Sequence, residues 1–339
     1  MIPRRVMLCL FLVALTASAS LAEQPRYLRL DLLTTNDLHA NLLPVNYAPN
    51  LKGKVPVVEN AGGAARRASV IREIRAEART PVLLLDSGDT TYGVNPLAKA
   101  FHGAPDVEVM NALAYEAMGP GNHDFQWPAA DSLRNIRNSR FPWVCANLVD
   151  KNTGKLLLEP YVIREIWGVR VAFFGLITQL VNKEVYKAAH ELNLESVEPI
   201  AVAAKLVPEL RAKADIVICL SHLGTVLDRQ LAKTAPGIDV ILGGHSHTRL
   251  PHPEAVQVAE PTAFCLGVVP VVQAFCWGGE IGRTQVIFRR DPATGRYALM
   301  SYNGDLISIN PSLAEDSEIA AIVGKYQKRM KPAAAAVKQ

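Results

Sequence analysis

The chain has 339 residues, of which 49% are hydrophobic and 20% charged, and its formal net charge is +4. This length and composition suit one large α/β domain and exclude a largely disordered protein. Two of the basic residues, Arg4 and Arg5, lie in the first 22 positions, so the rest of the chain has only a slight basic excess. Such an excess excludes the basic footprint of a stable nucleic-acid binder.

The first 22 residues have the organisation of a secretory signal peptide. Arg4 and Arg5 precede a short apolar run at 7–15, and Ser20-Leu21-Ala22 is a small-x-small cleavage site. An uncleaved anchor is the alternative, but the apolar run is short for a bilayer. We therefore predict a signal peptide at 1–22, a mature domain at 23–331, a disordered tail at 332–339, and a periplasmic or secreted protein without a membrane anchor.

Segments that indicate strands alternate with segments that indicate helices, which predicts an α/β fold. Apolar runs predict strands at 27–35, 81–85, 142–147, 216–220 and 240–242, and a hairpin of 161–165 with 169–176. Helical spacing predicts helices at 62–78, 107–118, 132–139, 199–212 and 226–234. The segment 41–58 is predicted to be a loop. The last part is mostly β, with strands at 268–275, 283–289 and 297–301 before a closing helix at 312–331.

Polar residues follow several of these strands directly. Asp37, Asp89, His222 and His245 each come just after an apolar strand. In α/β sheets, ligands bind outside the carboxyl ends of the strands. We therefore expect residues that are far apart in sequence to meet at one site.

Five short segments carry residues with metal-binding chemistry. They are Asn36-Asp37-Leu38-His39, Asp86-Ser87-Gly88-Asp89, Gly121-Asn122-His123-Asp124, Ser221-His222 and Gly243-Gly244-His245-Ser246-His247. Each has an ordinary explanation alone, since Gly-Asp after a strand is often a turn. Together they predict a site for two divalent ions, because carboxylate, amide and imidazole ligands without thiolate suit Mn²⁺, Zn²⁺ or Fe²⁺. Two such ions about 3.5–4 Å apart can clamp a phosphoryl group.

The order of these motifs resembles that of the calcineurin-like metallophosphoesterases, and most of all the 5′-nucleotidase / UDP-sugar hydrolase branch. The shared motifs include Thr35-Asn36-Asp37-x-His39, Gly62-Gly63-Ala64, Leu85-Asp86-Ser87-Gly88-Asp89, Met110-Asn111-Ala112-Leu113, Gly121-Asn122-His123-Asp124-Phe125 and Gly243-Gly244-His245-Ser246-His247. The resemblance spans about residues 27–330 and implies a single-domain, four-layer α/β/β/α sandwich.

The resemblance also implies a role for each residue. Asp37, His39 and His247 would bind the first metal, Asn122, His222 and His245 the second, with Asp89 bridging them. His123 would approach the substrate phosphate, and Asp86 would orient a ligand from behind. The implied reaction is hydrolysis of a small-molecule phosphoester, such as a nucleotide, by a metal-activated hydroxide.

Two departures from the branch affect these expectations. An acid usually follows the catalytic histidine by three positions and pairs with it, whereas this chain has Gln126 there. Asp124, next to His123, is the candidate to take over as a catalytic acid. Nucleotidases of the branch also carry a C-terminal nucleotide-recognition domain, which we expect to be absent because the chain stops at Gln339.

Three functions stay open at this point. The first is an exported hydrolase of nucleotides or related phosphoesters, acting on monoesters or diesters. The second is a thiosulfohydrolase-like enzyme, since those enzymes share the Gly-Gly-His-x-His ending. The third is a metal-binding module that needs a separate cap protein. The sequence also leaves open whether Cys265 and Cys276 form a disulfide.

Overall fold

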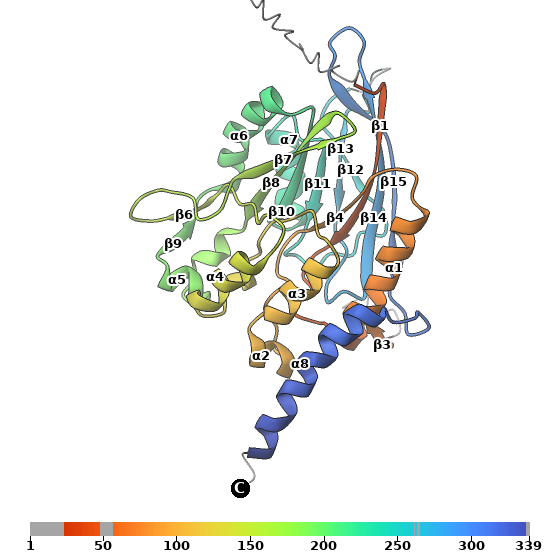
Figure 1. The fold of residues 1–339 in the computed structure, drawn as a ribbon. Coiled ribbons are helices and arrows are strands. Elements are labelled where there is room, and N and C mark those ends of the chain that lie inside the picture. The colour runs from red at the N-terminus through yellow and green to blue at the C-terminus, as the bar shows by residue number, and fades with distance from the viewer. Residues whose placement is uncertain (1–23, 48–56, 261, 263–264, 337–339) are drawn as a thin grey trace, which may run out of the picture.

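The computed structural model describes residues 24–47, 57–260, 262 and 265–336. The predicted signal peptide at 1–22 lies outside these residues. Within the described part of the chain, no helix is long and apolar enough to cross a membrane. Figure 1 shows two sheets packed face to face with helices on both outer sides.

The first sheet has five strands in the order β15–β14–β1–β4–β5. They are β1 (Tyr27–Thr35), β4 (Val82–Asp86), β5 (Ala117–Met118), β14 (Glu280–Arg290) and β15 (Tyr297–Ser308). β1, β4 and β5 are mutually parallel, whereas β14 is antiparallel to β1 and to β15. The carboxyl ends of β1, β4 and β5 therefore lie at one edge.

The second sheet has six strands in the order β12–β13–β11–β10–β8–β7. They are β7 (Tyr161–Ile166), β8 (Val169–Ile177), β10 (Ile216–His222), β11 (Val240–Gly243), β12 (Glu254–Gln257) and β13 (Val268–Val272). The four central strands are parallel, and the edge strands β7 and β12 are antiparallel to their neighbours. Parallel strands buried on both faces explain the continuous apolar runs of β8 and β10.

Three apolar clusters separate the four layers. Leu28, Leu30 and Leu32 of β1 face Phe173 and Ile218 of the second sheet in the central cluster. The opposite face of the first sheet packs on α1 (Ala64–Glu77), α3 (Ala104–Ala112) and α8 (Ser317–Ala336). The second sheet packs on α6 (Pro199–Lys213) and α7 (Thr225–Thr234). The predicted α/β/β/α sandwich is thus confirmed.

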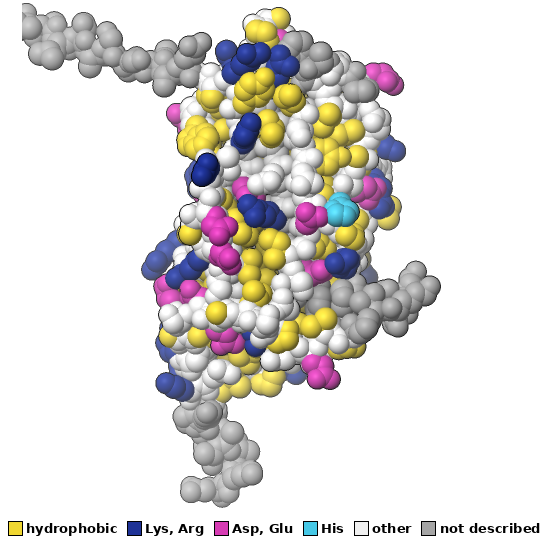
Figure 2. All heavy atoms as spheres, turned by 90° about the vertical axis from the view of Figure 1, so that its right-hand side faces the viewer, with side chains coloured by type: hydrophobic (Ala, Val, Ile, Leu, Met, Phe, Trp, Pro, Cys, Tyr) yellow, Lys and Arg dark blue, Asp and Glu magenta, His cyan; other side chains and the backbone are white. Residues whose placement is uncertain are grey.

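Smaller elements surround the sandwich. The helices α4 (Ala129–Asn138) and α5 (Lys187–Glu191) and the pair β6 (Leu148–Asp150) and β9 (Leu194–Ser196) lie beside its carboxyl edge. The helix α2 (Pro96–Phe101), two short 3₁₀ turns at His123–Phe125 and Gln179–Asn182, and the hairpin of β2 (Pro44–Tyr47) with β3 (Val58–Gly62) complete it. Figure 2 shows basic and acidic side chains interspersed over one face, with basic ones gathered at the end where β14 and β15 turn.

Several predicted elements are wrong in detail. The helix expected at 107–118 ends at Ala112, because Ala114 has a left-handed φ of 50° and Ala117–Met118 form β5. The strand expected at 142–147 supplies only isolated bridges at Trp143 and Val144. The loop expected at 41–58 contains β2 and ends in β3. In the first case, pairing of β5 with the distant strand β4 decided the local structure against the helical pattern.

The end of the chain also differs from expectation. α8 begins at Ser317, where Asp316 accepts a hydrogen bond from the backbone N–H of Ile319 and so caps the helix. The helix runs to Ala336 and so enters the segment expected to be a disordered tail, of which 337–339 lie outside the described residues. Cys265 and Cys276 are free thiols in this structure.

Candidate metal centre

The first group of converging side chains comes from the ends of β1 and β11. Nε2 of His39 lies 3.0 Å from Nε2 of His247, and the latter nitrogen lies 3.3 Å from Oδ1 of Asp37. Asp37 is fully buried and the two imidazoles are half-buried. Three ligand atoms of the kinds that divalent ions accept therefore converge on one point.

The second group comes from the ends of β4, β10 and β11. Asp89, His222 and His245 each offer one ligand atom, and these atoms lie within 4.8 Å of one another. Nε2 of His222 is 3.1 Å from Oδ2 of Asp89 and 4.0 Å from Oδ1 of Asp37. The two groups are therefore adjacent, with the two carboxylates between them.

Asn122 is oriented by a residue that the sequence analysis did not identify. Its Nδ2 donates a hydrogen bond of 2.7 Å to the hydroxyl of Tyr186, which lies 64 residues away in the chain. Both side chains are buried. With Nδ2 committed to this hydroxyl, Oδ1 of Asn122 is left as the potential ligand atom.

Five of the seven expected ligands have an unusual backbone conformation. The φ angles of Asp37, His39, Asp89, His245 and His247 lie between 47° and 74°, in the left-handed region. This conformation costs non-glycine residues about 1–3 kcal/mol each, and such residues cluster at functional sites. The fold therefore accepts backbone strain in order to turn these side chains toward one place.

Two glycines allow the loops to approach one another. A Cβ on Gly121 would lie 2.1 Å from Oδ1 of Asp89, and a Cβ on Gly244 would lie 2.9 Å from Nδ1 of His222. The loops after β4, β5 and β11 are thus in direct backbone contact around the site. A larger residue at either position would displace a ligand.

Asp124 has a role different from the expected one. Its buried carboxylate accepts hydrogen bonds of 2.8–3.1 Å from four backbone N–H groups, those of Asp89, Thr90, Thr91 and Gly121. It also accepts one from the hydroxyl of Thr91. It therefore ties the loop after β4 to the loop after β5. The expectation that Asp124 replaces the missing acid beside His123 is corrected: its carboxylate is committed to these backbone donors.

Asp86 likewise organises backbone rather than a ligand side chain. Its carboxylate accepts hydrogen bonds from the N–H of Gly88 and from the hydroxyls of Thr35 and Thr90. Burial raises the pKa of Asp86 to about 7, although these donors oppose the shift. Asp86 therefore acts on the turn that carries Asp89, and not directly on the side chain of a ligand.

Asn36 orients Asp37, a role that the motif alone did not reveal. Nδ2 of Asn36 donates to Oδ2 of Asp37 and to the carbonyl of Phe275, both at 2.7 Å. Oδ1 of Asn36 accepts from the N–H of Ala274. The end of β1 is thereby joined to the chain after β13.

His123 lies beside both groups, and its ring is held from two sides. Nδ1 of His123 is in a short hydrogen bond with Oε1 of Gln126, so the amide occupies the position expected for an acid. The ring of Tyr92 stacks on the imidazole with centroids 5.6 Å apart, and that of His39 lies edge-on at 5.1 Å. The backbone N–H of His123 donates to Oδ1 of Asp89.

The charges of the site favour a bound cation. Burial opposes negative charge on Asp89, but neighbouring imidazoles, His222 foremost, outweigh it and hold the pKa of that carboxyl well below its usual range. Burial also opposes charge on His222, yet Asp89 and Asp37 raise the pKa of its imidazole. Burial lowers the pKa of His245 to about 4 and also lowers that of His39, so both are neutral at pH 7.

The residues present fit two divalent ions. Oδ1 of Asn122 and Nε2 of His222 are buried, and neither makes a hydrogen bond of good geometry in the described structure. Nδ1 of His222 lies 2.6 Å from the carbonyl of Ser87 and donates to it, so Nε2 is the nitrogen that faces the site and that a metal would bind once its proton is released. Both atoms belong to the second group, and a divalent ion bound there would satisfy them, since buried polar atoms without a hydrogen bond are costly.

Two facing sheets with paired oxygen-and-nitrogen ligand groups at their carboxyl edge define a candidate dinuclear metalloprotein of the α/β/β/α class. The chain belongs to the calcineurin-like phosphoesterase family, whose family model matches residues 30–249. The match covers all five motif segments completely.

Individual relatives agree with this assignment. The chain is 32% identical to a snake venom 5′-nucleotidase of Gloydius brevicauda, over 94% of this chain and 55% of the relative. Among solved structures, a 5′-nucleotidase precursor from Thermus thermophilus is 30% identical with a TM-score of 0.74, over 92% of this chain and 60% of that one. A calcineurin-like phosphoesterase from Bacillus subtilis, YfkN, is 25% identical with a TM-score of 0.73, over 90% of this chain and 98% of that one.

The chain spans about half the length of the curated relatives that it matches. Their activities and substrates therefore belong to longer proteins. What this chain does with the shared site is argued below from its own residues.

Proposed function

We propose that this chain is an exported, two-metal phosphoester hydrolase of the 5′-nucleotidase type, acting on nucleotides or related small phosphoesters. The observation that carries the proposal is the convergence of two ligand groups and His123 at one edge of the sandwich. Membership of a phosphoesterase family supports it. The signal-peptide pattern of residues 1–22 supports a periplasmic or secreted location.

We assign Asp37, His39 and His247 to one ion and Asn122, His222 and His245 to the other, with Asp89 shared. Two bound divalent ions would supply a water nucleophile at neutral pH and offset the charge of the phosphoryl group. The ions are Mn²⁺, Zn²⁺ or Fe²⁺ by ligand chemistry, since nitrogen and oxygen donors occur without thiolate.

The chain's own groups complete the chemistry. His123 lies within ring contact of His39. While Nδ1 donates to Oε1 of Gln126, Nε2 can donate a hydrogen bond to the phosphate or to the leaving oxygen when the ring carries both protons. Asp124 and Asp86 keep the loops that carry Asp89 and Asn122 in register. The partner of the protein is thus a small-molecule phosphoester, and neither a nucleic acid nor a membrane takes part.

Hydrolysis assays on protein lacking residues 1–22 test this proposal. The substrates are 5′-AMP, p-nitrophenyl phosphate and bis-p-nitrophenyl phosphate with added Mn²⁺, and the control is Asn122→Ala. We expect metal-dependent turnover that the control lowers by at least about 10²-fold, as a lost catalytic group does. The preferred substrate sorts monoesterase from diesterase.

Absence of turnover with both ions bound would contradict the proposed reaction. It would leave two functions standing, a thiosulfohydrolase-like reaction and a module that needs a separate cap protein. Addition of a thiosulfate-type substrate distinguishes the first of these from the second.

A further inference from the structure

A groove leads away from the metal centre along the surface of the first α/β layer. Its inner part is a cavity of about 450 Å³ bordered by His39, His123 and His247. Its outer part is a cavity of about 520 Å³ between the start of β2, α2 and α8. Asn41, Val45 and Asn95 line both cavities, so the two adjoin one another.

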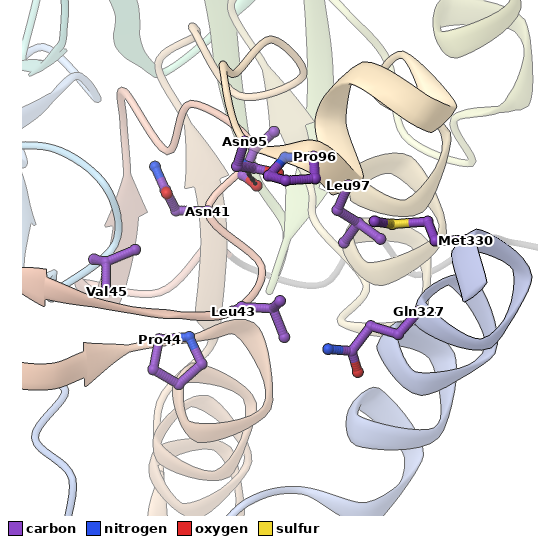
Figure 3. A pocket seen from close by; sticks show the side chains of 10 residues that line it. Asn41, Leu43, Pro44, Val45, Asn95, Pro96, Leu97, Gln327 and Met330 are labelled. Atoms are coloured by element: carbon purple, nitrogen blue, oxygen red, sulfur yellow. Dashed lines mark hydrogen bonds between the residues drawn. The ribbon is translucent and has the colours of Figure 1, made fainter. Parts of the chain in front are cut away.

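The outer cavity is apolar. Leu43, Pro44, Pro96, Leu97 and Met330 supply most of its wall. Figure 3 shows Leu97 and Met330 side by side, with Leu43 facing them across the open space and Gln327 at the rim. Leu43 is 39% exposed. Contact of its apolar surface with water is unfavourable, and a bound apolar group would remove that contact.

The polar side chains at the junction are already used by the backbone. Nδ2 of Asn41 donates to the carbonyls of Leu38 and His39. Nδ2 of Asn95 donates to the carbonyl of Ala40, and its Oδ1 accepts from the N–H of Ala98. No Lys, Arg, Asp or Glu lines either cavity in the described part of the chain.

We propose that this groove binds the apolar body of the substrate, so that the preferred substrates are phosphate monoesters of long-chain or otherwise apolar alcohols. The inference rests on the proposed function, which places the phosphate at the metal centre, and it narrows the proposed substrates from nucleotides to related phosphoesters with an apolar body. Tyr92 and Trp277 border the inner cavity and suit the first carbons beyond the phosphate. The alkyl body then extends past Val45 into the cavity of Leu43, Leu97 and Met330.

The same lining disfavours a polar body. A nucleobase in the outer cavity would face aliphatic side chains and would lose its hydrogen bonds to water without replacement. Additional phosphates would find no cation there. The groove of this chain therefore selects for apolar area rather than for hydrogen-bonding groups.

A chain-length series tests the proposal. Ethyl, butyl, hexyl and octyl phosphate are compared with p-nitrophenyl phosphate for kcat/KM with Mn²⁺. Once the chain reaches the outer cavity, we expect kcat/KM to rise about fourfold per added methylene, the gain from burying one such group. Binding of ethyl- and octylphosphonate, which are not hydrolysed, is measured by calorimetry in parallel.

The variant Leu43→Asn/Met330→Gln removes apolar wall without touching the metal centre. It should flatten both series, the kcat/KM values of the alkyl phosphates and the affinities of the two phosphonates. Val226→Asn is the matched control, because Val226 is an apolar residue with 74% exposure on α7. The control should keep the full chain-length dependence.

The outcomes separate this inference from the function beneath it. Hydrolysis of p-nitrophenyl phosphate with a flat chain-length series overturns the groove assignment and keeps the hydrolase; this is also the result if another protein or a second copy covers the groove. Absence of all hydrolysis overturns the proposed function, and the phosphonate affinities then decide the groove alone. Equal affinities for ethyl- and octylphosphonate would end the proposal in either case.

Discussion

Individual ligand residues in this site are held by their loops at the expense of backbone strain. Asp89 shows the arrangement most clearly, with a φ of 56° and a carboxylate that also accepts the N–H of His123. The adjoining Gly121 leaves no room for a side chain beside that carboxylate. Ligand position therefore depends on the neighbouring glycine as much as on the ligand itself.

Gly121→Ala tests this dependence. The added Cβ would meet Oδ1 of Asp89 at 2.1 Å, so the carboxylate must move away from the site. We expect metal content to fall from two ions to one or fewer per chain, as measured by mass spectrometry. Gly324→Ala is the control, because nothing lies within 4 Å of a Cβ at that helical position. Retention of two ions by Gly121→Ala would refute the argument.

Gln126 is the second test at the residue scale. Its Oε1 holds Nδ1 of His123, so Gln126→Ala frees the imidazole to rotate. We expect kcat to fall about 10-fold with unchanged metal content, because one positioned proton donor is worth about 10²–10⁴-fold and only its orientation is lost. Gln126→Asp should restore or exceed wild-type kcat by stabilising the charged imidazole. Equal kcat in all three proteins would show that the contact is not used.

The sequence could place Asp37, Asp89, His222 and His245 at the site because each directly follows a predicted strand, whereas the full set of proposed ligands, Asn122 included, came from the family resemblance of the motifs. It could not predict Tyr186 behind Asn122 or the backbone-clamping role of Asp124, because these depend on where distant segments pack. The sequence could predict that Gln126 lies beside His123, since the two are three residues apart. It could not predict that an amide would pair with the imidazole in place of an acid.

Among the elements, α3 carries a buried carboxyl group, that of Asp106, which takes no part in the site. Asp106 is buried, one of its oxygens makes no hydrogen bond in the described structure, and burial raises the pKa of its carboxyl well above the ordinary value, with Arg67 opposing only in part. When folding raises the pKa of an acid, the protein loses stability as the pH rises from the pKa of the unfolded state, about 3.9, toward the pKa of the folded state.

Asp106→Asn should remove that loss. We expect the free energy of unfolding of the variant to exceed that of the wild type by about 1–3 kcal/mol at pH 8, and by less at pH 5. Urea unfolding at both values measures this. Asp305→Asn serves as the control, since the side chain of Asp305 is 63% exposed. An unchanged pH slope in Asp106→Asn would show that the carboxyl carries no burial cost.

Element boundaries followed the sequence where apolar periodicity and a stop signal coincided, as in β1 and α7. They failed where the stop was conformational, as at Ala114, or where the partner was a short remote strand, as for β5. The hairpin of β2 and β3 was missed because its pairing is irregular, with a register shift between Val45 and Tyr47. Its position matters, because it forms one wall of the groove.

At the scale of the whole molecule, two sheets deliver residues from opposite halves of the chain to one edge. β1 and β4 bring Asp37 and Asp89, while β10 and β11 bring His222, His245 and His247. Alternating strands and helices predicted an α/β fold, and the four-layer α/β/β/α arrangement was predictable from the family resemblance of the motifs. The metal centre consequently joins the two sheets, and bound ions should stabilise the fold as a whole.

Chelation should reveal that coupling. Ions that bind only the folded state, at a free concentration 1,000 times their Kd, add about 4 kcal/mol to the free energy of unfolding. We expect EDTA to lower Tm by several degrees in the wild type, and to have no effect on Asp89→Ala, as measured by circular dichroism. Equal shifts in both proteins would show that the stabilising ions bind elsewhere.

The most direct test of the account is the number of Mn²⁺ ions bound per chain in protein lacking residues 1–22, measured by mass spectrometry after removal of free metal. The account predicts two ions in the wild type, one or fewer in His222→Ala, and none in Asp37→Ala combined with Asp89→Ala. A wild-type chain that holds no Mn²⁺, Zn²⁺ or Fe²⁺ would contradict the two-metal centre and the hydrolase built on it.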